Sequence, residues 1–122
     1  MPPELAGKRV LVVEYELLVA LLIEELLVDA GCIVIGPFAR VSAALAAAKA
    51  ELVDLALLDV NVAGERVFPV AHALEERAVP FLFVTGYGEA ALPKNRPDWE
   101  AVAKPFFAEA LTERLARRIK AA

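Results

Sequence analysis

Short apolar runs alternate with longer amphipathic segments along the chain. Apolar runs, the first of them led by Arg9, occupy residues 9–13, 32–35, 55–58 and 81–84, a pattern typical of strands that are buried on both faces of a sheet. A shorter run at residues 101–103 predicts a fifth strand. The third strand is expected to end at Asp59, and Gly36-Pro37 is expected to end the second.

The segments between these runs have helical patterns. We expect helices at residues 16–30, 41–51, 66–77 and 107–120. In the first of them the predicted buried, Leu-rich face consists of Val19, Leu22, Ile23, Leu26 and Leu27. Residues 86–97 contain two Gly and two Pro, which predicts a short or irregular helix there.

This alternation predicts one α/β domain over residues 1–122. Strands that alternate with helices imply right-handed crossovers and a parallel sheet. Five such units at this length fit a flavodoxin-like, doubly wound, five-stranded parallel sheet of order 2-1-3-4-5, with helices on both faces.

Composition narrows the classes of protein to consider. An apolar fraction of 59% is sufficient for a core without disulfides, and the single Cys32 fits a reducing compartment. A net charge of −4 without a basic patch argues against nucleic acid as a partner. The apolar run at residues 17–23 is too short to span a membrane, and no signal-peptide pattern is present, so we expect a cytoplasmic protein.

Polar side chains follow the predicted strands in an informative order. Glu14 follows the first strand, Asp59 ends the third, Thr85 follows the fourth and Lys104 follows the fifth. In this fold class the carboxyl ends of the strands meet at one edge, where ligands bind. Clustered carboxylates suit Mg²⁺, and a lysine and a hydroxyl suit phosphoryl oxygens. An Asp carboxylate can itself take a phosphoryl group as an acyl phosphate.

This ordered set resembles the receiver domain of two-component response regulators, the CheY-like family, over residues 8–120. In addition, Phe83-Val84-Thr85-Gly86-Tyr87-Gly88 is similar to the Phe-Ala-Thr-Gly-Tyr-Gly stretch of a subgroup of stand-alone receivers. In that subgroup the fourth helix is often irregular, in agreement with the Gly and Pro content of residues 86–97.

The resemblance implies a role for each of these residues. Asp59 would accept a phosphoryl group from a histidine kinase or a histidine phosphotransfer protein. Mg²⁺ would be held by Asp59, by Glu14 through water and by the backbone carbonyl of Asn61. Thr85 and Lys104 would bind phosphoryl oxygens, and the peptide bond between Lys104 and the following proline would be cis.

Tyr15 departs from the family pattern at the metal site. The family has a second acidic residue here, which ligates the metal directly, whereas a phenol is neutral at pH 7 and a poor Mg²⁺ ligand. Glu16 is the candidate to compensate for the missing acid, but it is expected to begin the helix rather than face the metal. We therefore expect weak or absent Mg²⁺ binding and slow or absent phosphorylation, with Tyr15 either closing the mouth of the pocket or serving only in packing.

A second departure concerns signal output. Receivers usually carry an aromatic residue three positions before the lysine, where this chain has Ala101, so Tyr87 and Trp99 are the candidates to replace it. With no output domain in this sequence, signalling would pass through contacts with an unidentified target. The surface of the fourth helix, fifth strand and last helix is the expected contact, and also the candidate homodimer contact.

Two other functions remain open beside a phosphorylated receiver, which is not expected to be an enzyme. One is a pseudo-receiver, in which the fold serves as a phosphorylation-independent interaction module, as Tyr15 and Ala101 favour. The other is an Asp-nucleophile phosphatase, which is disfavoured because its motif needs a second Asp where this chain has Asn61.

Overall fold

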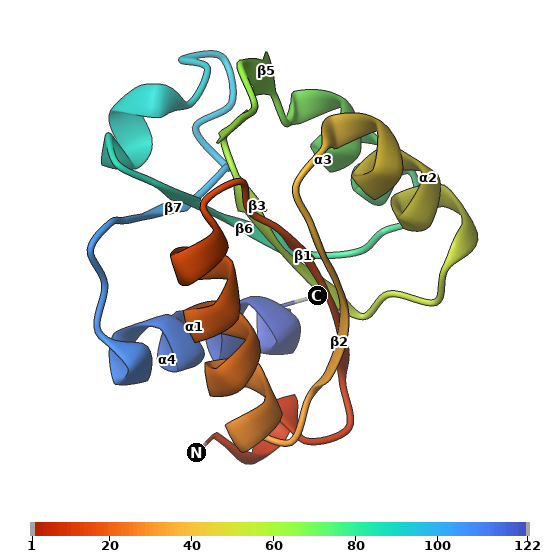
Figure 1. Cartoon of the computed structure of the whole chain (residues 1–122), viewed down its shortest axis with the longest axis vertical. Helices are drawn as coiled ribbons and strands as arrows, with labels where there is room; N and C mark the ends of the chain where they lie inside the picture. Colours follow the sequence, from red (N-terminus) through yellow and green to blue (C-terminus); the bar gives the residue numbers. More distant parts are fainter. Residues whose placement is uncertain (1, 122) are drawn as a thin grey trace.

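Five parallel strands form the central sheet of the protein, for which a computed structural model describes residues 2–121 (Figure 1). The sheet has the order β2-β1-β3-β6-β7. In sequence terms this is the predicted order 2-1-3-4-5, which is therefore confirmed. The strands are β1 (Arg9–Val13), β2 (Ile33–Phe38), β3 (Leu55–Asp59), β6 (Phe81–Thr85) and β7 (Ala101–Ala103).

Helices cover both faces of the sheet, as predicted. One face carries α1 (Leu17–Asp29) and α4 (Ala108–Ala121), and the other carries α2 (Val41–Ala50) and α3 (Phe68–Glu76) (Figure 1). Two short 3₁₀ helices complete the fold: η1 (Pro3–Leu5) and η2 (Gly88–Ala91). Within residues 2–121, no helix is both long enough and apolar enough to cross a membrane.

The continuous apolar strands fill two cores at once because successive side chains point to opposite faces. In β1, Val10 and Val12 belong to the core beneath α1 and α4, whereas Leu11 and Val13 belong to the core beneath α2 and α3. All four side chains are at most 1% exposed. This two-sided burial explains why the strands lack the alternation of polar and apolar residues seen in half-exposed sheets.

The prediction that β2 stops before Gly36-Pro37 is wrong, since the strand continues to Phe38. The pairing with β1 shifts register between Leu11 and Val13 to accommodate the extra residue. Proline is tolerated because β2 is an edge strand, on which a missing N–H leaves no neighbouring strand unpaired. Gly36 has φ +107°, and a Cβ atom there would lie 2.8 Å from the Phe38 nitrogen and 2.9 Å from the Val12 oxygen.

The helix predicted at residues 66–77 begins later than expected, and a small hairpin precedes it. Strands β4 (Asn61–Val62) and β5 (Glu65–Arg66) pair in antiparallel fashion. The two residues between them, Ala63 and Gly64, have φ of 53° and 84°, as in a type I′ turn. The hairpin was missed because its strands are too short to carry a periodic signal, and it delays the start of α3 to Phe68.

Helix α1 is more exposed than its pattern predicts. Ile23, Leu26 and Leu27 are buried as expected, but Leu22, predicted on the buried face, is 51% exposed. Three further leucines of the same helix are exposed. The helix is apolar on nearly every side, so its sequence pattern does not reveal which leucines face the core.

The predicted irregular segment after β6 is confirmed, because η2 is followed by a loop without regular structure. Trp99 anchors this loop: it is only 5% exposed and packs against Phe68 and Phe83. Its Nε1 donates a hydrogen bond to Glu75 at 3.1 Å, and the Arg96 guanidinium lies 4.3 Å from its ring centroid. A buried aromatic anchor thus replaces the packing of a regular helix.

We predict that Gly36→Ala lowers the free energy of unfolding by about 3 kcal/mol, because it combines an unfavourable φ with two backbone clashes. The matched control is Gly64→Ala, which also has a positive φ but has no atom within 4 Å of the new Cβ, and should cost about 1 kcal/mol. Urea unfolding measures both values. Equal losses in the two variants would show that the close approach at Gly36 is unimportant.

Candidate functional site

Four of the residues singled out in the sequence meet at the carboxyl edge of the sheet. Glu14 directly follows β1, Asp59 and Thr85 end β3 and β6, and Lys104 directly follows β7. Glu14, Asp59 and Thr85 are buried, with 2%, 7% and 4% of their surface exposed. The peptide bond that follows Lys104 is cis, as the family resemblance implies.

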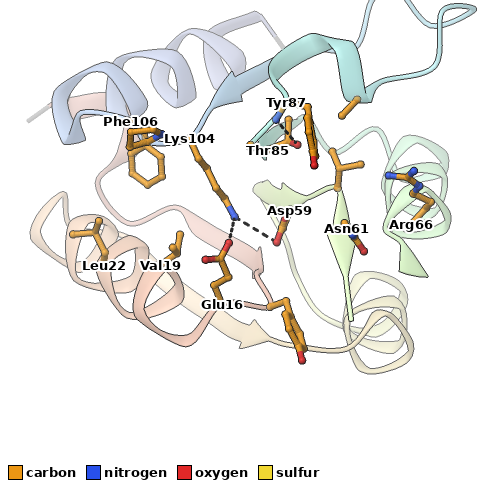
Figure 2. A pocket seen from close by; sticks show the side chains of 15 residues that line it. Glu16, Val19, Leu22, Asp59, Asn61, Arg66, Thr85, Tyr87, Lys104 and Phe106 are labelled. Carbon is orange, nitrogen blue, oxygen red and sulfur yellow. Dashed lines mark hydrogen bonds and ion pairs between the residues drawn. The ribbon is translucent and has the colours of Figure 1, made fainter. Parts of the chain in front are cut away.

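The ammonium group of Lys104 is the centre of the site. Its Nζ lies 2.9 Å from Glu14 Oε1, 3.3 Å from Glu16 Oε1 and 3.5 Å from Asp59 Oδ2. Figure 2 shows the Lys104 side chain extending between Glu16 and Asp59. One positive charge therefore lies among three carboxylates. The side chain of Lys104 is only 15% exposed, so water screens these interactions poorly.

Glu16 begins the helix, as predicted, and its carboxylate also lies in the site. It does precede α1 as the N-cap residue, but its carboxylate also reaches Lys104. Its backbone N–H donates a hydrogen bond to Glu14 Oε2 at 3.0 Å. The contact with Lys104 depends on how the chain turns between β1 and α1, which the sequence pattern does not indicate.

Burial raises the pKa of Glu14 from its ordinary value of 4.5 to about 7, and the hydrogen bonds from Lys104 and from the Glu16 N–H oppose this shift. Glu14 Oε2 accepts both of those hydrogen bonds. Oε1 is close to Lys104, but it accepts no well-directed hydrogen bond from any group within residues 2–121. Glu14 thus retains an unsatisfied, buried oxygen.

Lys104 keeps its positive charge in this environment. Burial alone would lower the pKa of its ammonium group, but the hydrogen bond to Glu14 and the negative charge of Asp59 outweigh burial and raise it. The backbone N–H of Lys104 donates to the Thr85 carbonyl at 2.8 Å, which fixes the end of β7 beside β6.

Thr85 has a hydroxyl group whose own hydrogen is free to donate. Its Oγ1 accepts a hydrogen bond from the Tyr87 backbone N–H at 3.3 Å, and it donates none to another group in the described part of the chain. The side chain of Tyr87 is 82% exposed. Trp99, the other aromatic candidate for signal output, is buried, and Ala101 is buried in β7.

A cavity of about 560 Å³ opens above Asp59 (Figure 2). Its polar lining includes Asp59, Asn61, Thr85 and Lys104. An apolar wall closes one side and consists of Val19, Leu22, Pro105 and Phe106. Neither this wall nor Arg66, which also lines the cavity, stood out in the sequence, because leucines and arginines are common on surfaces.

Tyr15 lies at the border of the cavity without being buried in it. It is 53% exposed and lines both this cavity and a neighbouring hollow formed with Arg40, Asn61 and Gly64. The phenol takes part in no side-chain hydrogen bond within residues 2–121. Tyr15 therefore supplies neither a charge to the site nor a contact that holds the carboxylates in place.

The carboxylate oxygens at the site are of the kind that Mg²⁺ prefers. Glu14 and Asp59 both approach Lys104 Nζ, so their carboxylates lie near one another, and Glu14 Oε1 is unsatisfied. Against this, residues 2–121 contain no group of three or more His, Cys, Asp or Glu side chains arranged to hold a metal ion. Lys104 occupies the position between the carboxylates, so a cation has to compete with its ammonium group.

Comparisons with known proteins identify the family. No protein-family model and no curated protein sequence matches the chain. Among solved structures, SdrG from Sphingomonas melonis Fr1 matches with 30% identity and a TM-score of 0.80, over 95% of this chain and 98% of that one. The chain belongs to the CheY-like response regulator receiver family. SdrG in its BeF3-activated conformation, from Pseudomonas melonis Fr1, matches this receiver with 34% identity and a TM-score of 0.75, over 91% and 95% of the two chains.

The receiver domain of the response regulator PhyR from Erythrobacter litoralis is also similar. It shares 28% identity with this receiver at a TM-score of 0.83, and the match covers 94% of this chain and 92% of that one. The similarity extends over nearly the whole length of each protein. It therefore includes both the central sheet and all four strand ends that form the site.

The raised pKa of Glu14 predicts how the stability of this receiver depends on pH. Between about 4.5 and about 7 the folded protein binds a proton that the unfolded chain does not, so the free energy of unfolding falls as the pH rises. In metal-free buffer, Glu14→Gln removes this contribution and should flatten the curve. Urea unfolding at a series of pH values measures it.

Glu16→Gln is the matched control, because it removes an exposed carboxylate that contacts the same lysine. It should leave the pH dependence between about 4.5 and about 7 close to that of the wild type. If Glu14→Gln and the wild type lose stability in parallel over this range, Glu14 does not bind the extra proton.

Proposed function

We propose that this chain is a receiver that accepts a phosphoryl group on Asp59 from a histidine kinase or a histidine phosphotransfer protein. The observation that carries the proposal is the position of Asp59: a buried carboxylate beneath an open cavity, with Lys104 3.5 Å away and Thr85 beside it. Signalling would then pass through protein–protein contacts, and Mg²⁺ binding would be weak because Tyr15 replaces an acidic ligand.

The arrangement suits in-line attack on a phosphohistidine. An Asp59 oxygen forms the new bond to phosphorus while the bond from phosphorus to the imidazole nitrogen breaks, and that nitrogen keeps the electron pair. Asp59, the backbone carbonyl of Asn61 and, through water, Glu14 would hold Mg²⁺, which when bound neutralises charge on the transferring group.

Lys104 and Thr85 have the groups needed to bind the product. Thr85 has a hydroxyl hydrogen free to donate to a phosphoryl oxygen. Lys104 can offer its ammonium group to another oxygen once the carboxylates around it rearrange, because an ammonium group attracts a dianion strongly when partly buried. Glu16, the most exposed of the three carboxylates, can move away at least cost.

A phosphorylation-independent module is the second candidate, and one observation favours it. Lys104 already contacts Glu14, Glu16 and Asp59, so the three carboxylates are held around a protein ammonium group without a metal ion. Tyr15 adds to this, because it lowers the number of negative charges that a metal would otherwise neutralise.

Binding of beryllofluoride, a phosphoryl analogue, tests the two candidates. We predict saturable, Mg²⁺-dependent binding to the wild type, and Mg²⁺ affinity at least 10-fold higher in Tyr15→Asp, which restores a charged ligand. Asp59→Asn should abolish analogue binding. Trp99 fluorescence and amide shifts report the binding, since Trp99 packs against Phe83 in the strand that ends at Thr85.

Two results would count against phosphorylation in this protein. Binding that appears only in Tyr15→Asp would support the phosphorylation-independent module. Binding in neither protein would reject the phosphoacceptor role of Asp59 altogether. Ordinary Mg²⁺ affinity in the wild type, unchanged in Tyr15→Asp, would instead refute the predicted weakening by Tyr15.

The exposed leucines of α1 support a docking site for the phosphodonor protein on this helix. Leu17, Leu18 and Leu21 are 70%, 81% and 50% exposed. They adjoin Leu22, which lines the cavity above Asp59, so a partner seated on α1 would reach the phosphoacceptor. Glu24, Glu25 and Asp29 add negative charge on the same helix. A second copy would repeat that charge, so the patch fits an apolar helical surface bordered by Lys or Arg.

We predict that Leu18→Ser combined with Leu21→Ser slows phosphotransfer from a histidine kinase by about 10-fold or more, because each leucine loses burial worth about 1.5–3 kcal/mol. Phosphorylation by acetyl phosphate, which needs no docking, should be unchanged. Leu52→Ser is the matched control, an exposed leucine just before β3 at the opposite edge of the sheet. An equal effect on both phosphodonors would contradict a docking role.

A further inference from the structure

Arg66 is a second cation in the cavity above Asp59, and the family resemblance gives it no role. It ends β5, and its side chain lines the cavity together with Asp59, Thr85 and Lys104. Figure 2 shows Lys104 on one side of Asp59 and Arg66 on the other, beyond Asn61. A group bound to Asp59 would therefore extend into a space with a cation on each side.

The β4–β5 hairpin fixes the backbone of Arg66 at this position. Arg66 pairs directly with Asn61, so the two side chains lie on the same face of the hairpin. Val62 and Val67 are fully buried, which anchors the hairpin in the core at both ends. The Val67 N–H also donates to the Val60 carbonyl at 2.9 Å. The hairpin thus holds the backbone of Arg66 in place, whereas its side chain is exposed and is not packed in the core.

The guanidinium group of Arg66 has no partner within residues 2–121. Most of the other arginines donate side-chain hydrogen bonds in the structure, namely Arg9, Arg77, Arg96, Arg114 and Arg118. Arg40 and Arg117 share the lack of a partner, but they do not line this cavity. Arg66 is therefore the one cation of the cavity lining, in the described part of the chain, that is not already committed to a carboxylate.

The charges of the site leave a need for such a group. Lys104 is shared by three carboxylates, and an acyl phosphate on Asp59 would carry a charge of about −1.5 to −2 in place of the single negative charge of the carboxylate. A bound metal ion would offset the negative charge of the phosphoryl group, but Tyr15 supplies no charged ligand for such an ion. A guanidinium group binds phosphoryl oxygens through paired, parallel hydrogen bonds and holds its charge at any physiological pH.

We propose that Arg66 is a phosphoryl-binding residue that closes on the modified Asp59 from the side opposite Lys104. This inference rests on the proposed phosphorylation of Asp59. In the free protein the guanidinium group is solvated. When the dianion is present, Arg66 supplies hydrogen bonds that Lys104, held by its carboxylates, provides only in part.

The test is a beryllofluoride titration at saturating Mg²⁺. Arg66→Gln should weaken analogue binding by about 10-fold, the loss expected for one hydrogen bond between charged groups, and Arg66→Lys should restore part of it. Arg117→Gln, which removes an exposed charge from α4, is the matched control and should change affinity less than about twofold. The Arg66 Nε–H resonance should shift on analogue binding in the wild type, which a purely structural role would not cause.

The outcomes separate this inference from the function on which it rests. If the wild type binds beryllofluoride and Arg66→Gln binds it equally well, Arg66 has no role at the site, although phosphorylation of Asp59 still stands. If only Tyr15→Asp binds the analogue, Arg66→Gln is made in that variant, and an unchanged affinity for beryllofluoride would again show that Arg66 has no role at the site. If neither protein binds it, both the phosphoacceptor role and the role of Arg66 are rejected.

Discussion

The ammonium group of Lys104 holds together an edge of the sheet that would otherwise repel itself. Parallel strands bring their carboxyl ends to one edge, and here those ends deliver Glu14 and Asp59, with Glu16 beside them. Buried carboxylates without a counter-charge are strongly unfavourable. The repulsion between the carboxylates is lowered in two ways. Glu14 can bind a proton, because its pKa is raised to about 7, and Lys104 contributes a positive charge. Any charged group that binds in the cavity therefore changes the interactions between these carboxylates and the Lys104 ammonium group.

Apolar side chains are also exposed beside this edge of the sheet. Leu22 and Phe106 line the cavity, and Leu17 and Leu18, in the same helix as Leu22, are exposed. A helix that served only to cover the sheet would place polar residues on its outer side. This helix instead buries Ile23 and Leu27 in the core and keeps a second apolar face beside the charged site. In the proposed function, chemistry on Asp59 and recognition of a protein partner would therefore take place on adjacent surfaces.

The sequence predicts the strands and the four strand-end residues because apolar runs form buried strands and parallel strands end at one edge. The strand order follows from the fit of five alternating units to the flavodoxin-like fold class. It fails where short-range geometry decides. The β4–β5 hairpin depends on positive φ at Ala63 and Gly64, and nothing in the periodicity indicates it. Glu16 reaches Lys104 through the turn before α1, and β2 passes Gly36-Pro37 by a shift of register. The sequence periodicity therefore predicts where the site lies, but not these local features of the backbone and their contacts.

Tyr15 acts on the charge balance in two opposing ways. Compared with an acidic residue it removes a ligand that would attract a cation, which disfavours Mg²⁺. It also removes a negative charge that Lys104 would have to offset, which makes the metal-free site more stable and lowers the repulsion met by an incoming phosphoryl dianion. In the proposed function, a site altered in this way would depend less on the metal and more on protein cations. The open cavity has Lys104 on one side of Asp59 and Arg66 on the other, and within residues 2–121 the guanidinium group of Arg66 has no partner. This is the arrangement that such a dependence would require.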